Sequence, residues 1–131
     1  MANSIKVING GCHTDQRGTL RFCNDFDMGA AKRFYTVCNS AEQPRRGWIM
    51  HKRETKWFFP IKGKTTVYVE SDDVRSESDY PFYTLDAAEP SVLQVPPGNW
   101  FLIEQDGAAE VMVFSNCKAG EFPKDDFRRP I

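Results

Sequence analysis

The sequence predicts an all-β protein built as a sandwich or barrel. Short runs rich in aromatic and β-branched residues alternate with turn residues at short intervals, and helical periodicity is nearly absent. Many short strands joined by regular turns are typical of sandwiches and barrels. At 131 residues, without an internal repeat or linker, the chain has the length of one domain that buries its own core. We therefore expect a single domain over residues 1–131.

Nine runs have the composition of strands, and turn residues such as Asn9-Gly10-Gly11 and Pro96-Pro97-Gly98 separate several of them. Ten phenylalanines add to this preference, because aromatic side chains favour strands over helices. In chain order, the expected strands are Ile5 to Ile8, Thr19 to Phe22, Arg33 to Cys38, Lys56 to Ile61, Thr65 to Glu70, Phe82 to Leu85, Ser91 to Val95, Trp100 to Glu104 and Val111 to Ser115.

Two neighbouring runs allow more specific predictions. Trp57 to Ile61 is continuously apolar, as in a strand covered on both faces. Pro60 within it predicts a sheet edge or a bulge, because proline has no N–H to donate to the ladder. Alternation from Thr65 to Glu70 predicts a half-buried strand. The short connection from Ile61 to Thr65 predicts a tight hairpin between these two strands.

Outside the strands, Asp25 to Ala31 predicts a single helical turn with Asp25 as its cap. The basic segment from Phe127 to Pro130 is interpreted as a surface tail. The predicted core includes six residues of the strands: Phe34, Phe58, Val67, Val69, Leu93 and Val113.

The composition excludes several classes of protein. Seventeen Lys and Arg against eighteen Asp and Glu give a formal net charge of -1, which excludes a globally basic nucleic-acid binder and an acidic tail protein. No apolar stretch approaches the ~20 residues that cross a bilayer, and residues 1–12 lack the pattern of a signal peptide. The four cysteines form no C-x-x-C pair. We expect free, partly buried thiols in a cytoplasmic protein without a membrane partner.

The chain has two histidines, which are too few for a barrel metal site with three nitrogen ligands and a carboxylate. His13 is predicted to lie in a loop. His51 lies among five basic residues, and nearby cations disfavour its imidazolium form. A neutral imidazole is a competent general base. The segment from Arg45 to Lys56 also fits a solvated basic loop with an incidental histidine. At the mouth of a barrel, its cations would suit a diphosphate.

Alternation places Arg33 and Tyr35 on one face of their strand, opposite Phe34. If that face points into a barrel, the tyrosine hydroxyl can act as an acid or hold an oxyanion. The alternative is a half-buried tyrosine whose hydroxyl contacts water.

Several motifs occur in a fixed order along the chain: Asp15 to Leu20, Lys32 to Tyr35, Arg46-Gly47-Trp48-x-x-His51-Lys52, Gly63, and Val95 to Trp100. This ordered set resembles small single-domain RmlC-like cupins, the nucleotide-sugar 3,4-ketoisomerases related to the dTDP-4-keto-rhamnose 3,5-epimerases. Phe22 to Asp27 is also similar to a branch labelled sugar epimerase in surface-polysaccharide clusters. The resemblance extends over about Ile5 to Asp126.

The resemblance implies a jelly-roll cupin, a homodimer, and a nucleotide-diphosphate 4-keto-6-deoxy sugar bound inside the barrel, with no metal, cofactor or nucleic acid. In such enzymes a histidine removes the proton beside the ketone, which gives an enediolate. Returning the proton to the neighbouring carbon moves the ketone, whereas returning it to the same carbon from the other face inverts that carbon. By position, the resemblance assigns His51 as base, Tyr35 as acid or oxyanion donor, and Arg33, Arg46 and Lys56 as substrate-binding residues.

Two departures from the family pattern keep further alternatives open. Ile49 and Phe101 stand where family members have histidines. The first alternative is therefore a non-catalytic cupin that binds a sugar nucleotide or supports a partner enzyme. The second is a 3,5-epimerase, because epimerases and isomerases share the first proton abstraction.

Overall fold

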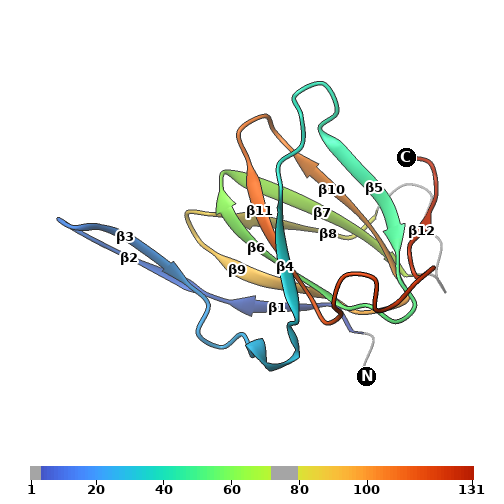
Figure 1. Ribbon diagram of the computed structural model, residues 1–131. Helices are drawn as coiled ribbons and strands as arrows, with labels where there is room; N and C mark the ends of the chain where they lie inside the picture. The colour runs from blue at the N-terminus through green and yellow to red at the C-terminus, as the bar shows by residue number, and fades with distance from the viewer. Residues whose placement is uncertain (1–3, 72–79) are drawn as a thin grey trace.

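Two antiparallel sheets packed face to face make up the body of the protein (Figure 1). The computed structural model describes residues 4–71 and 80–131. Within that part of the chain, no helix is long and apolar enough to cross a membrane. The arrangement confirms the predicted all-β sandwich.

The first sheet has the strand order β1-β9-β6-β11-β4, and the second sheet has the order β12-β5-β10-β7-β8. The first sheet consists of β1 (Lys6–Asn9), β9 (Ser91–Val95), β6 (Lys56–Lys62), β11 (Glu110–Ser115) and β4 (Arg33–Val37). The second sheet consists of β12 (Phe127–Arg128), β5 (Arg45–Met50), β10 (Asn99–Gln105), β7 (Lys64–Ser71) and β8 (Phe82–Asp86).

A two-stranded arm projects away from both sheets on the side of β1, blue in Figure 1. It consists of β2 (Gly11–Asp15) and β3 (Gly18–Phe22), which pair with each other as a separate sheet. Every residue of β3 is exposed, including Leu20. The prediction of a loop around His13 was wrong, because His13 lies in β2 opposite Leu20.

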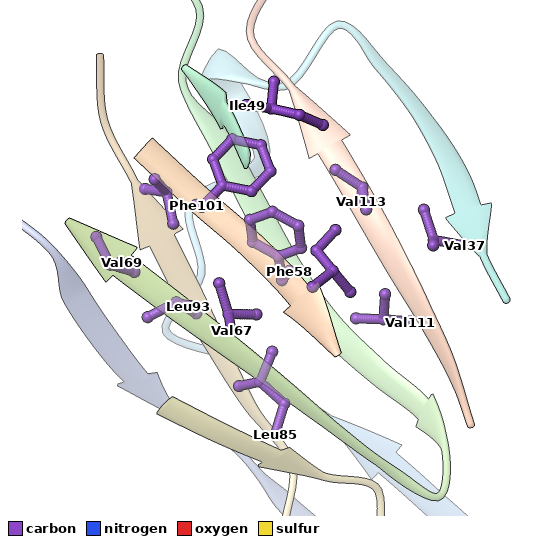
Figure 2. Close-up of a cluster of buried hydrophobic side chains, with 12 residues drawn as sticks. Val37, Ile49, Phe58, Val67, Val69, Leu85, Leu93, Phe101, Val111 and Val113 are labelled. Atoms are coloured by element: carbon purple, nitrogen blue, oxygen red, sulfur yellow. The ribbon is translucent and has the colours of Figure 1, made fainter. Parts of the chain in front are cut away.

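The core fills the space between the sheets with inward-facing aliphatic and aromatic side chains (Figure 2). It contains the buried residues Val37, Ile49, Phe58, Val67, Val69, Leu85, Leu93, Val95, Phe101, Ile103, Val111 and Val113. Five of the six predicted core residues are among them. Phe34 is the exception: it is 65% exposed, and its ring lies 6.2 Å from that of Phe114. The prediction failed because the inward face of β4 carries polar side chains at this end of the barrel.

Three strands lie outside the predicted set, β2, β5 and β12. The sequence of β5, Arg45–Met50, has two arginines and a glycine in six residues, so it lacks the β-branched composition of a strand. The solvated-loop alternative for this segment is therefore wrong. Phe127 and Arg128 form a two-residue strand against β5 rather than a free tail. The helical turn is shorter than predicted, a 3-10 turn over Met28–Ala30 capped by Asp27 instead of Asp25.

The predicted hairpin between β6 and β7 is also wrong. The two strands are consecutive in the chain but lie in opposite sheets, with β6 between β9 and β11 and β7 between β10 and β8. Gly63, with φ +67°, therefore turns the chain from one layer to the other. The prediction for Pro60 is confirmed, because the β6–β11 register shifts between Glu110 and Val111, and Val111 is the partner of Pro60.

The four cysteines are free thiols, as predicted. Cys117 is buried and Cys23 is half-buried, whereas Cys12 and Cys38 are exposed. Burial raises the pKa of the Cys23 thiol, so Cys23 is a weak nucleophile at neutral pH.

Gly47 lets β5 approach β10 closely near the bulge in their pairing. A Cβ at this position would lie 2.7 Å from the carbonyl oxygen of Phe101 and 2.9 Å from Cα of Leu102. Both neighbours are backbone atoms, which cannot move aside as a flexible side chain could. The φ of +137° adds strain for any residue with a Cβ.

We therefore expect Gly47→Ala to lower the free energy of unfolding by about 3 kcal/mol. Gly107→Ala is the matched control, because its Cβ would meet Ala41 at an ordinary 3.6 Å. Urea unfolding followed by tryptophan fluorescence measures both. Equal stability of the two variants would contradict the backbone contact at Gly47.

Candidate active site

A cavity of about 280 Å³ lies between the two sheets, and all five predicted site residues line it. Those residues are Arg33, Tyr35, Arg46, His51 and Lys56. Small-molecule sites typically occupy roughly 300–1,000 Å³. The cavity is therefore close to the lower end of that range.

Strand register places the polar residues of the first sheet side by side. Ser115 of β11 is the partner of Arg33 on β4 and of Lys56 on β6, so these three residues form one row across the sheet. The next inward row contains Tyr35, Val113 and Phe58. The barrel is therefore polar at one end and becomes apolar two residues further along each strand.

Glu54 lies at the centre of the polar end and is 6% exposed. One of its carboxylate oxygens accepts a hydrogen bond of 2.5 Å from the hydroxyl of Ser115. The same oxygen lies 3.2 Å from Nη2 of Arg33 and 3.7 Å from Nζ of Lys56. A buried carboxylate is costly unless cations and hydrogen-bond donors surround it, and here both are present. Sequence reasoning did not identify Glu54.

Lys56 donates a hydrogen bond of 2.6 Å from Nζ to the hydroxyl oxygen of Tyr35. The cations of Lys56 and Arg33 also lie 5.2 Å and 5.3 Å from the centre of the Tyr35 ring. Two neighbouring positive charges stabilise negative charge on or near the phenol oxygen. Tyr35 and Lys56 are therefore arranged to hold an oxyanion or to supply a proton.

The hydrogen bonds of His51 determine its tautomer. Nδ1 lies 2.7 Å from the main-chain carbonyl oxygen of Asp125, which can only accept, so Nδ1 carries the proton. In the neutral imidazole, Nε2 then has a free lone pair, and no group in the described part of the chain hydrogen-bonds to it. A buried nitrogen without a partner is costly and indicates a functional site. The same ring lies 6.0 Å from that of Phe101.

Residues 122–129, which we call the C-terminal strap, form the wall next to His51. The carboxylate of Asp125 accepts hydrogen bonds of 2.8 to 3.0 Å from the main-chain N–H groups of Lys52, Arg53 and Glu54. The turn after β5 is thereby fixed with His51 at its start. The segment from Phe127 to Pro130 lies at the surface, as predicted, but it is not a free tail, because Phe127 and Arg128 pair with β5. Asp125, just before it, is buried and builds the site.

His51, Glu54 and Asp125 offer ligand atoms within 4.8 Å of one another, an arrangement that resembles a metal site. Most of their donor atoms are engaged, however, with Nε2 of His51 as the exception. Both oxygens of Asp125 accept main-chain hydrogen bonds, and Nδ1 of His51 carries a proton. Glu54 already faces the cations of Arg33 and Lys56. This donor set therefore suits an internal charge cluster better than a cation.

The two positions that depart from the family pattern form an apolar wall of the cavity. Ile49 and Phe101 are partners across β5 and β10, and each is almost fully buried. The ring of Phe101 lies 5.5 Å from that of Phe58. Low-dielectric walls of this kind strengthen the electrostatic interactions of the charges opposite them.

Charged side chains gather at the rim of the cavity. Arg46 is exposed and donates from Nε to the side-chain oxygen of Asn39 at 3.2 Å. Lys124, Asp126 and Arg128 of the strap also line the cavity. Hydrogen bonds from Arg128 hold the pKa of the Asp126 carboxyl below its usual value, so Asp126 stays ionised at neutral pH and pairs with Arg128. Because Asp126 and Arg128 neutralise each other, Arg46 and Lys124 give the rim a positive charge.

The family model described as FdtA: WxcM-like, C-terminal matches residues 3–129. No curated protein sequence matches the chain.

Similar solved structures include the sugar 3,4-ketoisomerase QdtA from Thermoanaerobacterium thermosaccharolyticum in complex with TDP, with a TM-score of 0.74 and 16% identity over 98% of this chain and 90% of that one. The 3'-monoepimerase ChmJ from Streptomyces bikiniensis, in complex with dTDP-quinovose, has a TM-score of 0.76 and 12% identity over 95% and 68%. The Mycobacterium tuberculosis rmlC epimerase has a TM-score of 0.72 and 16% identity over 95% and 68%. These likenesses confirm the RmlC-like cupin fold.

The Glu54 cluster leads to a test of stability. Glu54→Gln leaves Arg33 and Lys56 without their buried counter-charge, so we expect the free energy of unfolding to fall by about 3 kcal/mol. Glu104→Gln is the matched control, because Glu104 pairs with Arg45 at 3.1 Å on the exposed face of the second sheet. The control should lose less than about 1 kcal/mol in the same urea titration. A larger loss in the control would refute the central role of Glu54.

Proposed function

This chain belongs to the FdtA family (WxcM-like, C-terminal), and on that premise we propose that it is a sugar-nucleotide isomerase that moves the ketone of a nucleotide-linked 4-keto-6-deoxy sugar from C4 to C3. The observation that carries this proposal is the unpartnered lone pair on Nε2 of His51, buried in a cavity that also holds Tyr35 and Lys56. The base is thus paired with an oxyanion-stabilising group in one site. The solved structures of similar fold include a sugar 3,4-ketoisomerase in complex with TDP.

In the proposed reaction, Nε2 of His51 removes the proton from C3 of the sugar. The electrons of the C3–H bond form the C3–C4 double bond, and negative charge develops on O4. Tyr35, held by Lys56, donates a hydrogen bond or a proton to O4. O3 then loses its proton, C4 receives one, and the ketone stands at C3. No electron acceptor is needed, because one carbon is oxidised and its neighbour is reduced. Nε2 is buried, so substrate binding must expose it.

The size and charge of the cavity support a binding mode in which the sugar and the diphosphate of the ligand occupy different places. At about 280 Å³ the cavity is too small for a whole nucleotide sugar, so the sugar lies inside and the diphosphate at the rim. Arg46 and Lys124 provide positive charge there. We place the reaction in surface-polysaccharide biosynthesis in the cytoplasm.

A non-catalytic sugar-nucleotide binder is the second candidate, and Ile49 and Phe101 favour it. These side chains provide no proton donor where family members have histidines, so His51 and Tyr35 would have to move every proton. A 3,5-epimerase is the third candidate, since it shares the first step.

We infer that two copies of the chain form a homodimer through the arm and the outer face of the first sheet. That face carries an aromatic cluster in which Phe26 lies 5.7 Å from Trp57 and 5.3 Å from Phe114. Phe34, beside this cluster, is 65% exposed. Phe34 is the exposed part of this surface, since Trp57 is buried, and exposed apolar side chains next to such a cluster are typical of protein interfaces. The arm, with its exposed Leu20, extends beyond the body (Figure 1), where a second copy could contact it.

The reaction is tested by proton NMR of dTDP-4-keto-6-deoxyglucose with the protein in heavy water. We expect loss of the signal of the ring proton beside the ketone, and the product spectrum separates isomerase from epimerase. His51→Asn should lower the exchange rate by about a hundredfold to ten-thousandfold, because no base remains. Binding of TDP, measured by calorimetry, should stay within about twofold and serves as the control for folding. Binding without exchange by the unaltered protein would favour the non-catalytic alternative.

The dimer is tested by light scattering after size exclusion. The unaltered protein should have twice the chain mass of 15.0 kDa. Phe34→Asp should shift the mass toward one chain, because a charge would be buried in the interface. Phe82→Asp is the matched control, since Phe82 is 61% exposed on the second sheet. A monomeric unaltered protein, or equal effects of both substitutions, would contradict this interface.

A further inference from the structure

We propose that Arg129, on the outside of the second sheet, is a positioning residue that holds His51 in the tautomer with a free Nε2. This inference rests on the proposed function, in which Nε2 is the base. Arg129 lies outside the cavity and contacts neither His51 nor the reacting atoms. Its effect would pass through the C-terminal strap.

The side chain of Arg129 is anchored from three sides. One of its terminal nitrogens forms an ion pair of 2.5 Å with Glu70, whose side chain is 2% exposed. The guanidinium group lies 4.9 Å from the ring centre of Trp48 and 4.7 Å from that of Trp100. An arginine stacked between two indoles and paired with a buried carboxylate is held far more firmly than a surface arginine.

The main chain links this anchor to the imidazole over four residues. The N–H of Arg129 donates to the carbonyl oxygen of Trp48 at 3.3 Å. Arg128 and Phe127 are then the partners of Ile49 and Met50. The strap therefore runs antiparallel to β5, and Asp125 lies beside the turn after β5. There its carbonyl oxygen accepts the proton of Nδ1 of His51 at 2.7 Å.

The anchor adds to the hold on the strap, which otherwise depends on a very short strand and on the hydrogen bonds of Asp125 to the turn after β5. A two-residue strand provides few ladder hydrogen bonds, and short edge segments open readily. If the strap moves away, His51 loses the acceptor that fixes its proton on Nδ1. The proton can then occupy Nε2, and that tautomer has no lone pair to remove a proton from the sugar.

The test uses ¹⁵N-labelled histidine, because the chain has two histidines and His13→Gln assigns their signals. In the unaltered protein, His51 should show a protonated Nδ1 and an unprotonated Nε2. In Arg129→Ala the two nitrogens should move toward averaged shifts, and proton exchange of the sugar should slow by about tenfold or more. Arg129→Gln is a milder second variant, with the same expected direction, in case the alanine variant unfolds. Arg45→Ala is the matched control, because it removes an exposed arginine–glutamate pair of the second sheet.

The outcomes separate the two proposals. An unchanged His51 tautomer in a folded Arg129 variant would overturn the positioning role, whatever the activity. The same change in Arg45→Ala would also overturn it, because the effect would then be a general loosening of the sheet. A tautomer shift in Arg129→Ala, combined with no exchange by the unaltered protein, would support the positioning role and refute the proposed reaction.

Discussion

The buried carboxylate of Glu54 is the interaction on which the rest of the site depends. A barrel of this size would ordinarily be filled with apolar side chains, as it is around Phe58 and Val113. Glu54 compensates the positive charge of Arg33 and Lys56, which allows both to remain inside the barrel. Without the negative charge of Glu54, the two cations would repel each other in this low-dielectric site, and their side chains would favour positions exposed to solvent. The two cations would then no longer be held in fixed positions at the polar end of the cavity, where the substrate binds.

One end of the barrel holds the apolar residues that stabilise the fold, and the other end holds the polar residues of the site. The same strands β4, β6 and β11 supply both ends, with the row of Arg33, Ser115 and Lys56 above the row that contains Val113. Register holds the polar groups in place, so the site is built on rigid strands rather than on loops. His51 and Glu54 are exceptions, because they lie in the turn after β5, and Asp125 lies in the strap before β12. Asp125 compensates for this by fixing three main-chain N–H groups of that turn.

Much of the fold could be predicted from local sequence, because period-two alternation and turn residues specify strands directly. The failures share a physical cause, which is that sheet membership is a long-range property. Nothing local distinguishes a hairpin at Gly63 from a turn between layers, and nothing in Arg45–Met50 indicates that pairing with β10 overrides its poor strand composition. Phe34 was assigned to the core, but it is exposed, because the inward face of β4 is the polar one that carries Arg33 and Tyr35.

The same limit applies to the site. The five predicted residues line one cavity, because strand alternation and the family resemblance both pointed to them. Glu54 and Asp125 were missed because each is an ordinary acidic residue in a charged segment, and their roles arise only when distant parts of the chain meet. A cluster of unusually many cations around one histidine was the available signal that a compensating carboxylate had to exist nearby.

The stacking of Arg129 between Trp48 and Trp100 also means that the protein's intrinsic tryptophan fluorescence can report on the position of this arginine. The chain has three tryptophans, and the third, Trp57, lies in the first sheet, where it hydrogen-bonds to Gln94 of the neighbouring strand. Indole emission responds to an adjacent cation, so two of the three fluorophores sense whether the guanidinium group is in place. The fluorescence of Trp48 and Trp100 would thus report indirectly on the tautomer of His51, which has no fluorescence of its own.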